Sequence, residues 1–116
     1  MKRKPSQSQS EKSQRAHQLS LRKLRKGIDA ADAHLMKILA RRFQVVEKVG
    51  ELKIQMGLPI LQKSRMTEML ESRQRDALRL GLDEKLIFQI FDLIHRASIE
   101  TQVQVFGRHK TKKKAP

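Results

Sequence analysis

The sequence predicts an all-α fold: a three-helix protomer with a long first helix, assembled as an intertwined homodimer. Apolar residues recur at steps of three and four, which is the helical period, and no segment shows the alternation of a strand. The chain has 116 residues and therefore forms one small domain at most. It contains no cysteine, which excludes a disulfide framework, a thiolate metal site and a cysteine nucleophile.

The first helix is predicted from Ser20 to Met56, where Gly57-Leu58-Pro59 ends it. Such a helix is about 55 Å long at about 1.5 Å per residue, whereas a compact domain of this size has a radius of gyration of about 13 Å. A second copy of the chain is therefore expected to cover part of its apolar stripe. A plain antiparallel coiled coil is the simpler alternative, but two further capped helices fit it poorly. The stripe consists of Leu21, Leu24, Ile28, Ala31, Leu35, Ile38, Leu39, Val45, Val46, Val49 and Leu52.

The second helix is predicted from about Ile60 to Leu80, and Gly81 stands in the usual position after a helix C-terminus. Asp83 is a natural N-cap for a third helix, with Glu84 in its first turn, and this helix ends near Phe106-Gly107. The second helix is expected to pack through Met66, Met69, Leu70 and Leu78. The third is expected to pack through Leu86, Ile87, Ile90, Phe91, Ile94, Ala97 and Ile99.

The net charge of +14 is concentrated at the two ends of the chain. Residues 1–27 carry +8 and residues 107–116 carry +5, whereas residues 28–106 carry only +1. The ends also contain few apolar residues, so burial cannot offset the entropy lost on ordering them. We therefore predict a basic disordered tail over 1–18, a helical domain over 19–106 and a second basic disordered tail over 107–116.

These tails can contact nucleic acid non-specifically through their charge. The balanced middle of the chain offers no basic face, and four Phe with no Tyr or Trp give little base stacking. No apolar run approaches the roughly 18 residues of a membrane span, and the N-terminus lacks the apolar stretch of a signal peptide. We expect a cytoplasmic protein that does not associate with membranes and has no appended regulatory domain.

Polar residues interrupt or border the apolar stripes, and a cation there costs stability unless an anion or hydrogen-bonding group lies opposite. Arg42 and Lys53 lie within about 20° of each other around the helix axis and can share one pocket, whereas Arg25 is about 100° away from Arg42. In a dimer, Arg25 could reach the partner's pocket. The set predicts a site for a small, multiply negative ligand, although each member alone could be a surface residue. Its members are Arg25, Arg42, Lys53, Arg65, Ser98 and Gln102.

The residues that carry this pattern fall into short pieces between Leu24 and Gln102. They are Leu24-Arg25-Lys26-Gly27-Ile28-Asp29, Asp32, Arg41-Arg42, Val49-Gly50-Glu51-Leu52-Lys53, Pro59, Arg65, Leu82-Asp83, Phe91 and Ser98-Ile99-Glu100-Thr101-Gln102. In this order they resemble the all-helical chorismate mutases, a class of small dimeric enzymes. The resemblance implies an isomerase of the shikimate pathway and aromatic amino acid biosynthesis, which rearranges chorismate to prephenate without a cofactor or metal ion.

The resemblance also implies roles for the cations at one end of the site. Arg42 and, from the other subunit, Arg25 hold the two carboxylates of the substrate, while Arg65 and Ser98 help to line that end. Bidentate pairing with carboxylates explains why arginine rather than lysine stands at these positions. The reaction is intramolecular, so holding the dianionic substrate in a compact conformation supplies much of the catalysis.

Lys53 and Gln102 are the catalytic residues by the same resemblance, because they hydrogen-bond the ether oxygen where negative charge grows as the bond breaks. Two further substrate-binding positions depart from the family. Gln62 stands where the family commonly has an aspartate, and Met66 stands where it commonly has a glutamate that binds the ring hydroxyl. Methionine accepts a hydrogen bond only weakly.

The departure at Met66 leaves other functions open. Isochorismate pyruvate lyases resemble the same fold and cationic cage, lack the glutamate, and release pyruvate and salicylate. A mutase of the amino analogue of chorismate and a non-catalytic member of the fold are further alternatives. The alternative from another class is a basic helical dimer that binds nucleic acid or acts as a structural adaptor. We favour the mutase because Ser98 and the run into Gln102 match the mutase pattern.

Overall fold

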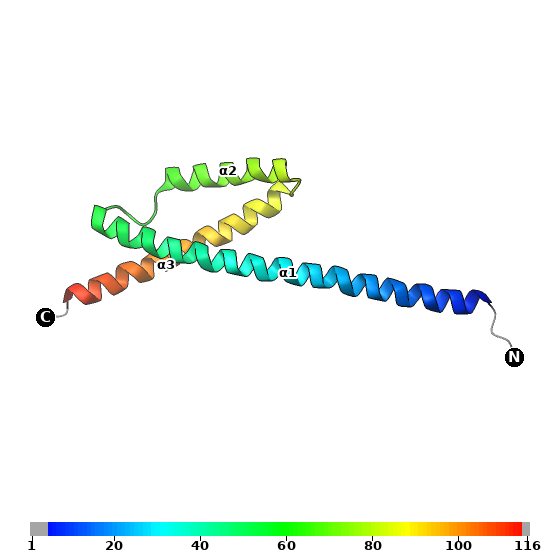
Figure 1. Ribbon diagram of the computed structural model, residues 1–116. Coiled ribbons are helices and arrows are strands. Elements are labelled where there is room, and N and C mark those ends of the chain that lie inside the picture. Colours follow the sequence, from blue (N-terminus) through cyan, green and yellow to red (C-terminus); the bar gives the residue numbers. More distant parts are fainter. Residues whose placement is uncertain (1–4, 115–116) are drawn as a thin grey trace. The chain divides into compact units, whose positions relative to one another are not determined.

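The computed structural model describes residues 5–114 as three helices joined by two short connections (Figure 1). These helices are α1 (Pro5–Met56), α2 (Lys63–Leu80) and α3 (Glu84–Lys114). No strand occurs within the described range, which confirms the predicted all-α class. Over the same residues, none of the helices combines the length and the apolar character needed to span a membrane.

The first and third helices, α1 and α3, are longer than the sequence predicted. α1 begins at Pro5 rather than near Ser20, and α3 continues to Lys114 rather than ending near Gly107. The predicted disordered tails are therefore helical over 5–18 and 107–114, while 1–4 and 115–116 lie outside the described residues. The physical reason is local: Lys, Arg, Gln and Glu are good helix formers, and proline is well tolerated in a first turn. The domain limits of 19–106 stay a prediction.

The chain divides into two units, residues 1–40 and 41–116, and α1 contributes to both. In the first unit the apolar stripe of α1 is open to solvent: Leu24 is 69 %, Ile28 59 % and Leu35 54 % exposed. Between residues 9 and 38 every side chain is exposed. The single chain therefore leaves this stripe without a cover.

The second unit contains the last turns of α1, together with α2 and α3. α2 packs against α3, and Met69 and Ala77 of α2 are buried. Val105 of α3 is buried beside Gly50 of α1. Leu78, predicted to pack, is exposed instead. It lies about 100° around the helix from Ala77, which places it off the buried face.

α1 ends in the turn that Gly57 was predicted to form. Gly57 has a φ of +68°, a conformation that favours glycine. Its N–H donates to the Ile54 carbonyl at 3.2 Å, and the Leu58 N–H donates to the Lys53 carbonyl at 2.9 Å. This pair of bonds is a Schellman motif, which satisfies the last carbonyls of the helix. It also fixes the backbone of Lys53 at the helix end.

The connection between α2 and α3 confirms the two predicted caps. Gly81 has a φ of +72° and ends α2, with the Leu82 N–H donating to the Ala77 carbonyl at 2.8 Å. At the start of α3, the Lys85 N–H donates to Asp83 Oδ1 at 3.3 Å. Asp83 therefore serves as the N-cap. The two caps fix where α3 begins relative to α2.

Gly50 lies where α1 passes close to α3. It is buried, and a Cβ at this position would lie 3.4 Å from Gln102 Cγ and from two atoms of the Val105 side chain. The small residue brings the backbone of α1 against Gln102, four residues from the predicted Ser98. This approach allows side chains from α1 to reach polar groups on α3.

Candidate active site

A cavity of about 320 Å³ lies within the unit formed by residues 41–116. All three helices and the connection before α2 contribute to its wall. Seven of the eight predicted site residues line it, which brings together positions up to 60 residues apart in the sequence. The lining residues are Arg42, Val46, Val49, Lys53, Ile60, Gln62, Arg65, Met66, Met69, His95, Ser98, Ile99 and Gln102.

Two consecutive hydrogen bonds connect Arg42 to α3. Its Nη1 donates to Ser98 Oγ at 2.9 Å, and Ser98 Oγ donates to the Ile94 carbonyl at 2.8 Å. Ser98 is only 5 % exposed, so it fixes the guanidinium from a buried position. Burial lowers the pKa of Arg42, and the nearby charges of Arg73 and Arg65 lower it further. Repulsion among these cations makes a bound anion favourable at this end of the cavity.

Lys53 forms the second polar centre of the cavity. Its Nζ donates to the Gln102 Oε1 at 2.7 Å and to the Ile60 carbonyl at 2.6 Å. Burial lowers the pKa of Lys53, because desolvation disfavours the charged form. An ammonium has three N–H donors, and these two bonds leave one for a ligand.

Gln102 is 6 % exposed and is oriented by Lys53. Since its Oε1 accepts from the ammonium, its Nε2 is the remaining donor. That nitrogen makes only a long bond of 3.4 Å to the Ser98 carbonyl, within its own helix. A ligand oxygen could therefore compete for this N–H.

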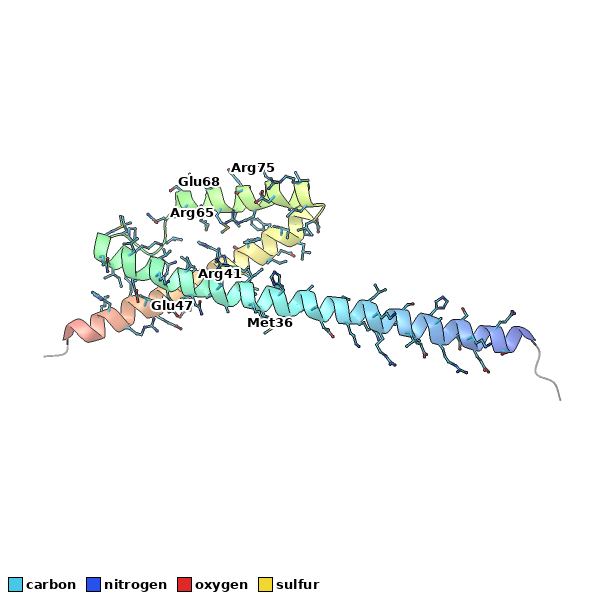
Figure 2. The ribbon with its side chains drawn as sticks, viewed as in Figure 1. Met36, Arg41, Glu47, Arg65, Glu68 and Arg75 are labelled. Carbon is cyan, nitrogen blue, oxygen red and sulfur yellow. The ribbon has the colours of Figure 1, made fainter. Side chains whose placement is uncertain are left out.

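The start of α2 supplies Arg65 and the two positions that depart from the family pattern. Arg65 is exposed and lies in the first turn of α2 (Figure 2). Gln62 precedes the helix in an extended conformation, and its side chain makes no capping hydrogen bond. It lines the cavity together with the half-buried Met66. Neither residue adds a carboxylate.

His95 is a lining residue that the sequence reasoning missed. It lies three residues before Ser98 and seven before Gln102, which places all three on one face of α3. That spacing is the signal that could have identified it. Its Nε2 is buried and has no hydrogen-bond partner among the described residues. Burial is the main cause that lowers its pKa; the charges of Arg42 and Lys53 add to this and Asp92 opposes it.

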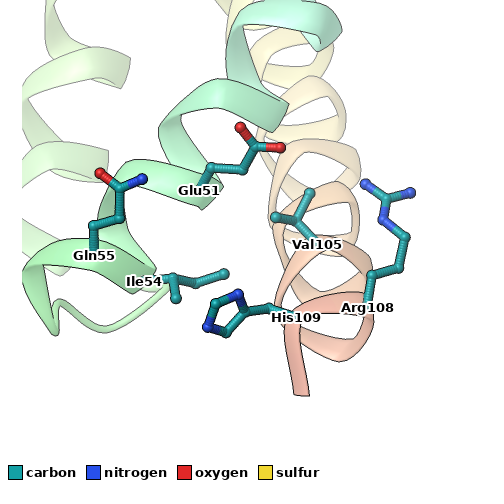
Figure 3. A pocket seen from close by; sticks show the side chains of 6 residues that line it. All are labelled: Glu51, Ile54, Gln55, Val105, Arg108 and His109. Carbon is teal, nitrogen blue, oxygen red and sulfur yellow. The ribbon is translucent and has the colours of Figure 1, made fainter. Parts of the chain in front are cut away.

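The lining of this cavity includes three cations and no acidic residue among the described side chains. A second cavity, of about 230 Å³, lies between the end of α1 and α3 (Figure 3). Its wall carries the Glu51 carboxylate beside Arg108 and His109. Of these two cavities, the first has a positive lining that no acidic residue offsets, and this lining suits a dianion.

Arg25 is the predicted site residue that is not among the lining residues. It belongs to the unit formed by residues 1–40, where it is exposed on α1. The cavity itself is built from residues of 41–116. The sharing of Arg25 between subunits therefore stays a prediction.

Comparisons with known proteins match the part of the chain that forms this cavity. Residues 24–103 match the model of the family described as chorismate mutase type II, and this range includes all eight predicted site residues. The chain is 38 % identical over 79 residues to the T-protein of Enterobacter agglomerans, covering 68 % of this chain and 21 % of that protein. It therefore spans about a fifth of the length of the T-proteins that it matches.

Two relatives are closer to this chain in length. The 4-amino-4-deoxychorismate mutase of Streptomyces venezuelae is 30 % identical over 77 residues, covering 66 % of this chain and 75 % of that protein. The chorismate mutase of Methanocaldococcus jannaschii is 27 % identical over 95 residues, covering 80 % of this chain and 96 % of that protein. The family match extends over most of the chain and over the whole cavity, and the chain belongs to the chorismate mutase type II family.

Proposed function

We propose that this chain is a chorismate mutase, which converts chorismate to prephenate by intramolecular rearrangement. The observation that carries the proposal is the pairing of Lys53 Nζ with Gln102 Oε1 at 2.7 Å in a cavity lined by cations. The family match and the relatives named as mutases support it. In the reaction one C–O bond breaks and one C–C bond forms, with no proton transfer to or from the protein.

The cations would hold the two substrate carboxylates in a reactive conformation. Arg42 is preoriented by its 2.9 Å bond to Ser98, so little side-chain entropy remains to be lost on binding. Arg65 lies close enough to Arg42 for its charge to lower the pKa of Arg42. Guanidinium groups pair bidentately with carboxylates, so Arg42, with Arg25 of the other chain, would hold the two carboxylates while Arg65 lines that end of the cavity. Fixing both ends of the substrate supplies the orientation effect that an intramolecular reaction needs.

Lys53 and Gln102 would stabilise the charge that develops on the ether oxygen. The third N–H of the Lys53 ammonium and the weakly bonded Nε2 of Gln102 are the donors left for this oxygen. Removal of one preorganised donor of this kind from an active site costs about 10²–10³ in kcat. The two residues orient each other before substrate binds, which is the condition for such an effect.

A homodimer is part of the proposal. The exposed apolar stripe of α1 in residues 1–40, which includes Leu24 and Ile28, supports it because large exposed apolar surfaces mark interfaces. In that dimer Arg25 of one chain would complete the cationic cavity of its partner. The cytoplasmic location expected from the sequence stays a prediction.

An isochorismate pyruvate lyase is the second candidate, and Met66 in the cavity wall favours it. To separate the two, the purified protein is incubated with chorismate and, separately, with isochorismate, and the products are identified by chromatography. We expect prephenate from chorismate. Salicylate and pyruvate from isochorismate alone would establish the lyase, and no turnover of either substrate would refute both.

Removing the basic ends of the chain tests the alternative that the protein is a nucleic-acid binder and not an enzyme. Contact with nucleic acid would come from residues 1–27 and 107–116, which carry most of the excess charge. Deleting residues 1–18 and 108–116 leaves the whole cavity in place. We expect the truncated enzyme to keep its kcat and KM, whereas a nucleic-acid binder would lose its affinity and show no turnover at any length.

A further inference from the structure

His95 has a feature that the proposed mechanism leaves unused. Its Nε2 is buried without a partner among the described residues, although the residue lines the cavity. Buried polar atoms in folded proteins nearly always have a hydrogen-bond partner, and an exception calls for an explanation. The nearby Asp92 does not supply one, since its Oδ2 forms an ion pair with Arg96 at 3.3 Å.

The charge state of His95 sets what it can bind. Burial and the positive charges of Arg42 and Lys53 hold its pKa below the ordinary value of 6.5, against the opposing effect of Asp92. The ring is therefore neutral at pH 7, with one N–H donor and one acceptor nitrogen. A neutral imidazole adds little to the binding of a carboxylate that several cations already hold. It suits a neutral group that can both donate and accept, such as a hydroxyl.

The surrounding wall leaves one substrate group for His95. The cations and Gln102 are matched to the carboxylates and the ether oxygen. What remains of the substrate's polar groups is the ring hydroxyl, and Met66 in the same wall accepts hydrogen bonds only weakly. An ammonium in place of this hydroxyl would meet Arg42, Lys53 and Arg65 with no carboxylate in the lining to offset them.

We propose that His95 is a substrate-binding residue whose imidazole, once turned so that the unpartnered Nε2 faces the cavity, hydrogen-bonds the ring hydroxyl and selects a hydroxyl-bearing substrate over its amino analogue. This inference rests on the proposed function. It assigns to α3 a contact that Met66 on α2 can make only weakly. His95 thereby determines which ring substituent the cavity accepts.

The test compares wild type, His95→Leu and His95→Gln by measuring kcat and KM for chorismate. We expect the leucine variant to raise KM about tenfold, because it leaves the buried hydroxyl unpaired. The glutamine variant is expected to stay within about threefold of wild type, because its amide can still hydrogen-bond the hydroxyl. The control is His109→Leu, which changes a half-buried histidine of α3 that lines the second cavity (Figure 3). A leucine variant within twofold of wild type would overturn the inference.

A second measurement does not depend on how well the variants fold. Each enzyme is assayed with chorismate and with an analogue whose ring hydroxyl is replaced by hydrogen, and the ratio of the two kcat/KM values is taken. Wild type should prefer chorismate about tenfold, and His95→Leu should lose this preference, as a double-mutant cycle requires of two interacting groups. An unchanged ratio in His95→Leu would overturn the contact. Faster turnover of 4-amino-4-deoxychorismate than of chorismate by wild type would overturn the selectivity.

These outcomes separate the inference from the function on which it rests. If wild type converts no chorismate, the proposed function fails. If wild type converts chorismate and the His95 variants match it in both measurements, the function stands and only the role of His95 fails.

Discussion

Residues 41–116 bury polar side chains, whereas residues 1–40 expose large apolar ones. In the unit 41–116, polar Ser98 and Gln102 are buried, and each is hydrogen-bonded to a cation from α1. In the unit 1–40, apolar Leu24 and Ile28 are exposed. The first arrangement holds the side chains of a candidate site within one chain, whereas the second leaves an apolar stripe that a second chain would cover in the proposed dimer. The contrast indicates which residues act locally and which act through assembly.

The largest expected effect concerns the local site. Lys53→Ala should lower kcat by about 10²–10³, because it removes a preorganised donor from the ether oxygen. The variant should keep wild-type sedimentation behaviour, since Lys53 lies outside the stripe of residues 1–40. Lys48→Ala is the matched control, as Lys48 is an exposed lysine of α1 that does not line the cavity. Near wild-type turnover of Lys53→Ala would contradict the catalytic role.

The next effect concerns assembly. Ile28→Asp should weaken dimerisation by about 100-fold, because it places an unpaired carboxylate in an apolar interface at a cost of about 3 kcal/mol. Analytical ultracentrifugation over a concentration series measures the change. Ala33→Asp serves as the control, since Ala33 is exposed and lies on the opposite side of α1 from the stripe. Equal dissociation constants for both variants would show that the stripe is not the interface.

Subunit mixing joins the two regions in one experiment. Arg25→Ala and Lys53→Ala should each be nearly inactive alone. After exchange of equal amounts, half of the dimers carry one complete site, so activity should recover to about a quarter of wild type if sites are shared. Exchange is followed with differently tagged chains. Proven exchange without recovery would place Arg25 outside the partner's site.

The pH dependence of turnover tests whether the positive charge of Lys53 is needed. Burial holds the pKa of Lys53 below its ordinary 10.5, so the ammonium loses its proton at a lower pH than an exposed lysine does. Turnover should therefore fall as the pH rises, before 10.5 is reached, while circular dichroism shows that the helices persist. A kcat that stays constant up to pH 10.5 would mean that the charge of Lys53 is not needed.

The smallest effect compares one glycine from each region. A Cβ at Gly27 would meet nothing within 4 Å, whereas one at Gly50 would contact Gln102 and Val105 at 3.4 Å. Gly27→Ala should stabilise the protein by about 1 kcal/mol through helix propensity. Gly50→Ala should gain less, because its neighbours must accommodate the methyl group. Thermal unfolding of both variants checks the order, and a larger gain at Gly50 would contradict the close packing.

Local chemistry made much of this fold and site predictable. Gly81 and Asp83 could be assigned because helix ends have strong residue preferences that do not depend on the rest of the fold. Helical spacing places Arg42 and Lys53 on one face of α1, and the family resemblance adds Gln102 of α3 to the same site. The cavity confirms that these three residues meet.

The remaining features depend on competing effects or on tertiary geometry. The helices over 5–18 and 107–114 were missed because low apolar content was weighed above helix propensity. His95 was missed because a histidine on an apolar face resembles a core residue until the burial of its Nε2 is known. The bond from Lys53 to the Ile60 carbonyl could not be predicted, because it depends on the path of the connection after α1.

Two hydrogen bonds join Lys53 to the turn that follows α1. The Lys53 carbonyl accepts the Leu58 N–H at 2.9 Å, and Lys53 Nζ donates to the Ile60 carbonyl at 2.6 Å. Loss of the ammonium charge removes the charge assistance from the second bond. The protonation of the Lys53 amine and the order of this connection are therefore thermodynamically linked. Amide hydrogen exchange across residues 58–62 becomes a reporter of the protonation state of Lys53, readable without any substrate.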